Sequence, residues 1–304
     1  MTTIDILLPY YGPVDLMKAS VGSILAQYDP DWRLTVVDDG YPDDSIPGWF
    51  AELGDDRVRY LRNERNLGAN RNYQKCLGLI EHELVVIMGA DDLMLPNYVQ
   101  TIRAANAAYP KAAVIQPGVQ IIDAVGRPVR TLVDETKRLI YAPRVKGRSV
   151  LCGEELAVSL SRGNWLYFPA LCWRSDAIVG IGFREKLDTI QDLALVMDLV
   201  ARGEELVVDP QVCFQYRRHR ASDSSWRALA GSRFIEERAF FSDHARRMEA
   251  LGWRRAARAS RNHLSSRLNA LALLPLAARK RHWVGVRSLS GHVFGRATPN
   301  RGEG

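Results

Sequence analysis

The sequence has few cysteines, no long apolar run and no recognisable leader. Its 304 residues include four cysteines, with no CxxC pair and no histidine at zinc-ligand spacing, so we expect buried thiols in a reducing compartment. The N-terminus lacks a basic segment and an apolar core, which argues against a signal peptide. The apolar run 268–278 is too short to cross a bilayer and contains Pro275. We expect a cytoplasmic protein, free or held peripherally at the inner face of the cell membrane.

Repeats and low-complexity segments are also absent, but charge is distributed unevenly. Residues 1–216 carry 22 Lys and Arg against 29 Asp and Glu, a net charge of −7, whereas residues 217–304 carry 19 against 6, a net charge of +13. The composition, 47% hydrophobic and 25% charged, is that of a globular protein. The basic C-terminal part indicates a polyanionic partner, either an anionic membrane or a nucleic acid. Because it contains no recognisable nucleic-acid-binding module, we expect no nucleic acid partner.

Short apolar runs alternate with helical patterns over the first 120 residues. Continuous apolar runs, typical of strands buried on both faces, occupy residues 4–8, 34–37, 58–61, 84–88 and 113–116. Helical periodicity between them predicts helices at 14–25, 69–81 and 97–108. This alternation predicts an α/β fold with a mostly parallel central sheet flanked by helices. In such sheets, ligands bind beyond the carboxyl ends of the strands.

Three of the expected strands end in residues suited to binding a ligand. The strand ends read Pro9-Tyr10-Tyr11-Gly12, Asp38-Asp39-Gly40 and Gly89-Ala90-Asp91-Asp92. Each acidic pair has a structural alternative, as turn residues or as a helix cap. Two acidic pairs at one sheet edge, however, repel each other unless a cation or a hydrogen-bonding ligand lies between them. A diphosphate neutralised by Mg²⁺ or Mn²⁺ meets that need, because both ions prefer hard oxygen ligands.

The order and spacing of these motifs resemble those of glycosyltransferase family 2, whose members have the GT-A fold and transfer sugars with inversion. The resemblance covers roughly residues 3–220, in four motifs: Ile4–Tyr11, Ser20–Gln27, Val36–Gly40, and Asn66–Gly68 with Arg71-Asn72. It implies a nucleotide-diphosphate sugar as donor, with a UDP-sugar favoured, and a glycan, lipid-linked or small-molecule acceptor. Family members of this kind serve cell-envelope polysaccharides, among other products.

The resemblance also implies residues for the donor site. Those expected at the nucleotide and its phosphates are Pro9, Tyr10, Tyr11, Asp38, Asp39, Arg71 and Asp91. Asp91, with Asp92 beside it, would ligate Mn²⁺ or Mg²⁺. Gly89 stands where the family carries the first acid of its DxD motif, so the metal site would rest mainly on Asp91.

An inverting transfer needs a general base that takes the proton of the acceptor hydroxyl. The family carries an acidic pair followed by an apolar helix that ends in glycine, and here Asp192 stands eleven residues before Gly203. We therefore expect Asp192 to be the base, with Asp188 as second choice; a helix cap is the structural alternative for Asp192. Gln191 replaces the first acid of the pair.

Segment 214–220 resembles the family's Tyr-Arg-x-His segment. Arg218 and His219 would reach the diphosphate there, although His219 also has a structural interpretation. Trp165 and Tyr167 are candidates for stacking on an acceptor sugar, with a core position as an equal alternative.

We expect a catalytic domain at 1–220, with a nucleotide-sugar half at 1–120 and an acceptor half at 121–220 that begins with an irregular lid at 124–150. A basic helical extension at 221–294 and a disordered tail at 295–304 would follow. The extension either contacts anionic membrane or packs on the catalytic domain. A degenerate module that binds nucleotide sugars without catalysis is the alternative function. A nucleotidyltransferase is disfavoured, because Pro9-Tyr10-Tyr11-Gly12 replaces the expected glycine-rich loop.

Overall fold

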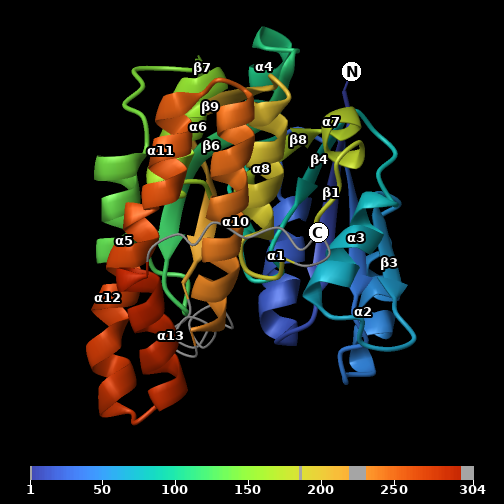
Figure 1. Ribbon diagram of the computed structural model, residues 1–304. Coiled ribbons are helices and arrows are strands. Elements are labelled where there is room, and N and C mark those ends of the chain that lie inside the picture. The colour runs from blue at the N-terminus through green and yellow to red at the C-terminus, as the bar shows by residue number, and fades with distance from the viewer. Residues whose placement is uncertain (1, 185–186, 219–230, 296–304) are drawn as a thin grey trace.

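A computed structural model describes residues 2–184, 187–218 and 231–295 (Figure 1). His219 and residues 296–304 of the expected tail lie outside the described residues. A nine-stranded sheet forms the centre, in the order β3-β2-β1-β4-β8-β6-β9-β5, with β7 paired to β9. The strands are β1 (Ile4–Tyr10), β2 (Trp32–Asp38), β3 (Val58–Arg62), β4 (Leu84–Ile87), β5 (Leu93–Met94), β6 (Ala112–Ile122), β7 (Ser149–Leu151), β8 (Cys172–Arg174) and β9 (Glu205–Arg217).

Strand direction differs between the two halves of the sheet. Strands β1 to β4 pair in parallel, as their buried apolar sequences predict. In the second half, β6 and β9 are parallel, but β8, β7 and β5 run antiparallel to their neighbours. The parallel register pairs Tyr10 with Asp38 and Asp38 with Arg62. The carboxyl ends of β1, β2 and β3 therefore meet at one edge.

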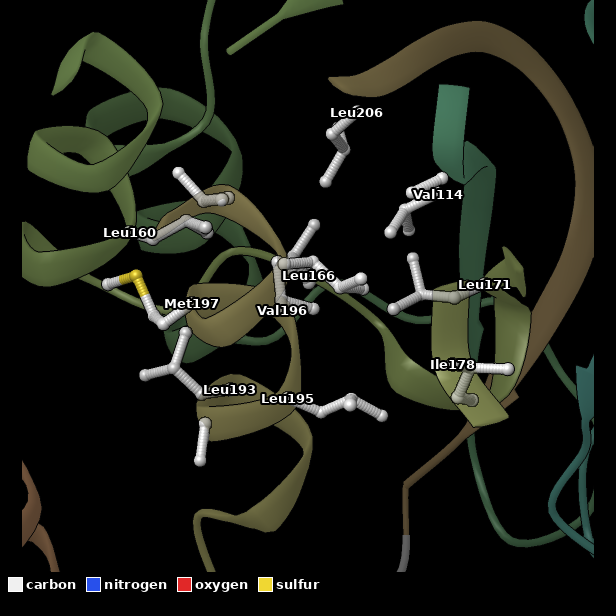
Figure 2. Close-up of a cluster of buried hydrophobic side chains, with 14 of the residues drawn as sticks. Val114, Leu160, Leu166, Leu171, Ile178, Leu193, Leu195, Val196, Met197 and Leu206 are labelled. Atoms are coloured by element: carbon white, nitrogen blue, oxygen red, sulfur yellow. The ribbon is translucent and has the colours of Figure 1, made fainter. Parts of the chain in front are cut away.

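Helices cover both faces of the sheet. They are α1 (Val14–Leu25), α2 (Ser45–Leu53), α3 (Ala69–Leu77), α4 (Tyr98–Ala108), α5 (Leu132–Thr136), η1 (Lys137–Tyr141), α6 (Gly153–Arg162), η2 (Phe168–Ala170), α7 (Ser175–Val179), α8 (Gln191–Ala201), α10 (Ser232–Ala250), α11 (Arg254–Asn262), α12 (Leu264–Arg279) and α13 (Trp283–Phe294). Apolar residues of α1, α2 and α4 fill the core on one face. Residues of α3, α6, α8, α10 and α11 fill the core on the other face, where α8 contributes Leu193, Val196 and Met197 (Figure 2).

The first of the C-terminal helices, α10, packs on the α/β body. Glu236 of α10 accepts hydrogen bonds from the main-chain N–H groups of Asp188, Thr189 and Ile190 at 3.1, 2.7 and 2.8 Å, just before α8 begins. Its carboxylate thereby satisfies donors at the start of a helix that has no side-chain cap of its own. Arg247 of α10 also pairs with the buried Asp198 of α8. The packing alternative for the basic extension is therefore realised for α10.

Helices α12 and α13 pair with each other and form a hairpin at one end of the molecule (Figure 1). They share a small core with α10, built around Phe234, Ala270 and Leu289. No helix in the described part of the chain is long and apolar enough to span a membrane.

Three segments differ from the sequence prediction. The helix expected at 69–81 ends at Leu77, with Gly78 as its C-cap. Residues 124–150 were expected to be irregular, but they contain α5 and η1, a π-helix. Thr131 caps α5 by accepting a hydrogen bond from the N–H of Asp134 at 3.1 Å. Helix α2 was not expected, because Pro47 and Gly48 near its start are poor helix formers.

Candidate functional site

Asp38 and Asp39, at the end of β2, are both buried and hydrogen-bonded within the chain. Asp38 accepts hydrogen bonds from the N–H of Tyr41 at 2.8 Å and from the hydroxyl of Tyr60 at 2.5 Å. Asp39 accepts three: from the side-chain amide of Asn63 at 2.8 Å and from the N–H groups of residues 67 and 68 at 2.8 and 2.9 Å. These carboxylates order the loop after β2 and the loop between β3 and α3. Three donors leave Asp39 about one of the four acceptor positions of a carboxylate.

A cluster of three tyrosine rings lies at the end of β1. Tyr10 is buried and donates from its hydroxyl to the carbonyl of Gly12 at 2.6 Å, while the ring of Tyr11 is 56% exposed. The ring of Tyr41 lies edge-on to Tyr11, with centroids 5.3 Å apart, and 5.5 Å from that of Tyr10. The arrangement offers an open aromatic surface on which a planar base can stack.

Asp91 and Asp92 lie after β4 and both approach Gly89. A Cβ at Gly89 would lie 2.6 Å from Oδ2 of Asp92 and 3.0 Å from Oδ1 of Asp91, so the two carboxylates occupy space that a side chain would fill. Asp92 is buried, whereas Asp91 is partly exposed. Burial and the neighbouring Asp91 raise the pKa of Asp92 well above its usual value, against the opposing N–H of Arg217. A cation beside this pair would reverse that shift.

Arg217, the last residue of β9, holds the Asp91-Asp92 loop in place. Its main-chain N–H donates to Oδ1 of Asp92 at 2.8 Å, and its Nε donates to the carbonyl of Asp91 at 2.6 Å. Its guanidinium also donates to the carbonyls of Asp123 and Ala124, each at 3.2 Å. The buried guanidinium thus joins the loop after β4 to the loop after β6.

Asp192 lies in the first turn of α8, where the charges of two cationic side chains affect its carboxyl group. Burial raises the pKa of its carboxyl, while the N–H of Leu193 and the charges of Lys137 and Arg233 oppose that increase. Lys137, in η1, donates to the carbonyl of Leu166 at 3.3 Å and lies 4.7 Å from the ring centroid of Tyr167. Burial and the charge of Arg218 lower the pKa of Lys137 to about 8.

Two tyrosines connect the acidic groups. Burial raises the pKa of Tyr73 in α3, and the charges of Asp91, Asp192 and Asp92 add to the increase. Burial raises the pKa of Tyr216 in β9 to about 12, with Asp92 and Asp91 again contributing. Because electrostatic effects on a pKa act over short distances, Tyr73 lies near both the Asp91-Asp92 pair and Asp192. Three elements far apart in the sequence therefore converge on one site.

Arg218 follows β9 and forms a partly buried ion pair with Asp134 of α5. Its guanidinium donates to the two carboxylate oxygens at 2.5 and 3.1 Å, a bidentate geometry. The hydroxyls of Tyr167 and Thr131 donate to the same carboxylate at 3.0 and 2.5 Å. Burial alone would raise the pKa of Asp134, but the hydrogen bonds from Arg218 and Thr131 outweigh it and lower the pKa.

The remaining expected residues have varied surroundings. Arg71 is exposed on α3, and Asp188 lies just before α8. Trp165 is buried and donates to Ser159 at 3.1 Å, so it has the core position rather than the exposed one. Tyr167 is partly exposed beside Asp134. Sequence reasoning missed several residues of the site, for which only proximity to a motif offered a signal: Tyr41, Tyr73, Asp134 and Lys137. Tyr216 and Arg217 lie within the segment 214–220 that the sequence singled out.

The acidic pair can hold a metal only with help from a ligand. Among the described residues, no group of three or more His, Cys, Asp and Glu side chains is arranged to hold an ion. Mg²⁺ and Mn²⁺ are commonly bound through one or two carboxylates together with substrate phosphates and water. The two carboxylates after β4 fit that pattern.

Both the sequence and the fold match known proteins. The profile described as Glycosyl transferase family 2 matches residues 5–158. An uncharacterized protein of Mycobacterium tuberculosis is 27% identical over 245 residues, covering 77% of this chain and 73% of that protein. An uncharacterized glycosyltransferase of Rickettsia conorii is 28% identical over 225 residues, covering 73% of this chain but only 35% of the relative. The chain thus spans about a third of that relative's length.

A shorter match joins the chain to an enzyme with a lipid-linked substrate. The Escherichia coli UDP-Glc:alpha-D-GlcNAc-diphosphoundecaprenol beta-1,3-glucosyltransferase is 28% identical over 94 residues, covering 31% of this chain and 37% of that enzyme.

Solved structures share the fold. S. aureus TarS 1–349 in complex with UDP-GlcNAc superposes with a TM-score of 0.62 at 13% identity, covering 97% of this chain and 92% of that chain. Mannosyltransferase PcManGT from Pyrobaculum calidifontis, in complex with GDP-Man and Mn²⁺, gives 0.62 at 15% identity, covering 96% and 86%. The expected α/β architecture is confirmed.

Proposed function

The chain belongs to glycosyl transferase family 2 and has the GT-A fold of a glycosyltransferase, and from this premise we propose that it transfers a sugar, with inversion, from a nucleotide-diphosphate sugar to a hydroxyl group of its acceptor. A UDP-sugar is the favoured donor, as in the TarS complex. The acceptor is a glycan, a lipid-linked glycan or a small molecule of cell-envelope polysaccharide synthesis.

The donor nucleotide would lie across the ends of β1 and β2. Tyr11 and Tyr41 supply an aromatic surface for the base, and Pro9 and Tyr10 shape the loop below it. Asp39 retains about one acceptor position for the base, while Asp38 fixes the main chain at Tyr41. Arg71, exposed on α3, would approach the base or the phosphates.

The metal would be held by Asp91, the more exposed of its pair, with Asp92 behind it and the diphosphate completing the ligand set. Such a metal, Mn²⁺ or Mg²⁺, stabilises the charge that develops on the leaving diphosphate. Arg217 keeps the carboxylate of Asp92 oriented through its N–H, and Arg218 would lie at the phosphates when they bind. His219, outside the described residues, is proposed as a second donor to the diphosphate.

Asp192 would act as the general base. Its carboxylate takes the proton of the acceptor hydroxyl as that oxygen attacks the anomeric carbon and the bond to the diphosphate breaks, which releases the nucleoside diphosphate. Lys137 and Arg233 favour the ionised carboxylate, which is the form that a base requires. The buried Oε1 of Gln191 has no partner among the described residues and would be available to an acceptor hydroxyl.

The basic C-terminal helices would bring the enzyme to its acceptor. We place α12 and α13 at the surface of an anionic membrane, which suits a lipid-linked acceptor such as the one named for the Escherichia coli relative. Helices α11 to α13, residues 254–294, carry nine Lys and Arg and no Asp or Glu, so that surface is attracted to anionic headgroups.

The observation that carries the proposal is the carboxylate pair Asp91-Asp92 after β4, which the main-chain N–H and Nε of Arg217 hold beside the loop after β6. The test is turnover of a panel of nucleotide sugars, with and without Mn²⁺, using Asp192→Asn and, as its matched control, Asp188→Asn. We expect Asp192→Asn to abolish transfer and retain donor binding, and Asp188→Asn to retain both. Full transfer by Asp192→Asn would refute the assignment of the base, and an absence of turnover with every donor would refute the proposed reaction.

A further inference from the structure

A groove with a volume of about 700 Å³ opens between the C-terminal helices, away from the proposed donor site. Its lining includes five arginines, one or two from each of the four helices, and no acidic residue: Arg238, Arg246, Arg261, Arg267 and Arg287. We call this the arginine groove. Like charges converging on one groove repel each other, and an anion among them removes that repulsion.

The described carboxylates offset only part of this charge. Arg246 pairs with Asp243 at 3.1 Å, and Arg261 pairs with Glu249. Arg267 donates instead to the main-chain carbonyls of Val293 and Gly295 at 3.3 and 3.2 Å. A carbonyl satisfies a hydrogen bond but leaves the positive charge in place. The nearby Glu237 is buried and already engaged by Arg233 and Ser266.

Apolar side chains lie beside the arginines. Ile235 and Val284 line the same groove, yet 65% and 76% of their surfaces are exposed. Trp283, next to Val284, is also exposed. On α12, exposed Leu264, Leu268 and Leu271 recur at helical spacing, so they share one face of that helix.

Guanidinium groups bind phosphate in bidentate geometry, and exposed apolar residues on a basic helix are typical of a membrane interface. A free phosphate would use the arginines but not the apolar side chains. A lipid phosphate uses both.

We propose that the arginine groove binds the phosphate of an anionic membrane lipid, with the acyl chains against Ile235, Val284 and Trp283. The inference rests on the membrane contact of the proposed function and gives that contact a specific site. The groove would place the enzyme at a bilayer without any membrane-spanning helix.

The test compares charge removal inside and outside the groove in the full chain. The groove variant is Arg246→Gln/Arg287→Gln, and the matched control is Arg258→Gln/Arg279→Gln, which removes two arginines from α11 and α12 outside the lining. Binding is measured by sedimentation with vesicles of phosphatidylcholine containing phosphatidylglycerol, and with phosphatidylcholine alone. We expect the control to weaken binding about thirtyfold, at about 1 kcal/mol for each of the two charges lost, and the groove variant to weaken it at least tenfold further. Thermal unfolding verifies that both variants fold.

Equal losses of vesicle binding in the two double variants would refute the lipid site in the arginine groove, but they would still support a membrane contact. If the wild-type protein binds both kinds of vesicle equally, both the contact with an anionic membrane and the lipid site in the groove are refuted. The sugar-transfer assay tests the proposed reaction independently of these results.

Two further measurements identify the source of the phosphate. Val284→Ser should weaken vesicle binding, whereas Val125→Ser, an equally exposed valine far from the groove in sequence, should not. Equal behaviour of the two valine variants would contradict the lipid assignment. Inorganic phosphate should raise the melting temperature of the wild-type protein by less than the vesicles do; a larger shift with phosphate would assign the groove to a free anion.

Discussion

Gly89 and Asp92 compete for the same space: a Cβ at Gly89 would lie 2.6 Å from Oδ2 of Asp92. A glycine at position 89, where the family resemblance implies the first acid of the DxD motif, therefore leaves room for the carboxylates of Asp91 and Asp92. Because Oδ1 of Asp92 is already held by the N–H of Arg217, the carboxylate cannot move freely to admit a side chain.

We therefore predict that Gly89→Ala weakens Mn²⁺-dependent donor binding by about 1–2 kcal/mol, roughly tenfold in Kd. Calorimetric titration of the nucleotide sugar measures the change. Gly48→Ala is the matched control, because a Cβ there meets no atom within 4 Å, and it should leave donor affinity unchanged. Unchanged affinity in Gly89→Ala would show that the carboxylates do not need the space.

The Asp134–Arg218 pair is expected to stabilise the acceptor half. Asp134→Asn should lower the free energy of unfolding by about 2 kcal/mol, less than for a fully buried pair because a third of the Arg218 side chain is exposed. The lowered pKa of Asp134 means that this stability is present above the usual pKa of 3.8 and is lost as the pH falls through the folded value. Chemical denaturation at pH 7 and pH 3 measures both effects. Glu135→Gln, which alters the exposed pair with Arg138, should change little.

Lys137 should set the pH at which Asp192 becomes active. Its charge helps to keep the pKa of Asp192 down, so Lys137→Met should raise that pKa and move the acid limb of the kcat/KM profile to higher pH. In the wild-type enzyme this assistance disappears above about pH 8, where Lys137 itself loses its proton. Arg138→Met removes a neighbouring exposed charge and should leave the profile in place. If kcat/KM depends on pH in the same way in the two variants, Lys137 does not influence the general base.

His244 is expected to destabilise the protein in acid. It is buried against Phe240, neither ring nitrogen has a partner among the described residues, and burial together with Arg247 lowers its pKa from 6.5 to about 4. The unfolded chain binds a proton more readily between these values, so stability should fall as the pH drops from 6.5 to 4, by about 3 kcal/mol in total.

His244→Phe should remove that part of the pH dependence, as measured by denaturation across this range. His282→Asn, which removes an exposed imidazole but keeps an acceptor at the start of α13, should retain the dependence. If the free energy of unfolding of His244→Phe depends on pH as steeply as that of the wild-type protein, other groups cause the acid sensitivity.

The sequence predicts the first half of the fold well, since strands buried on both faces carry continuous apolar runs that stand out without any partner. The placement of Asp38 and Asp91 beyond the same edge of the sheet follows from the parallel order of those strands. Antiparallel pairing by β7 and β8 was not predictable, because each is only three residues long and its direction depends on distant partners. Asp134 could not be predicted for the same reason, because its role depends on Arg218, which lies 84 residues away in the sequence.

The position of Trp165 also differs from the sequence prediction, because its side chain is buried. Trp165 follows a Gly-Asn loop and was a candidate for an exposed sugar platform, yet its indole turns inward and donates to Ser159. Nothing in the sequence alone separates these two orientations of an aromatic residue. The roles proposed for Asp192 and for the donor residues remain predictions that the variants above address.

The hydrogen bonds of Glu236 have a consequence for any attempt to recombine members of this family. The region that matches the family profile ends at residue 158, yet the turn that presents Asp192 is capped by a carboxylate from α10. A chimera that exchanges the segment around α8 while keeping a foreign C-terminus would inherit the helix without its cap. A segment exchanged to transfer the proposed general base should therefore include α10, and the junction of the chimera should lie after that helix.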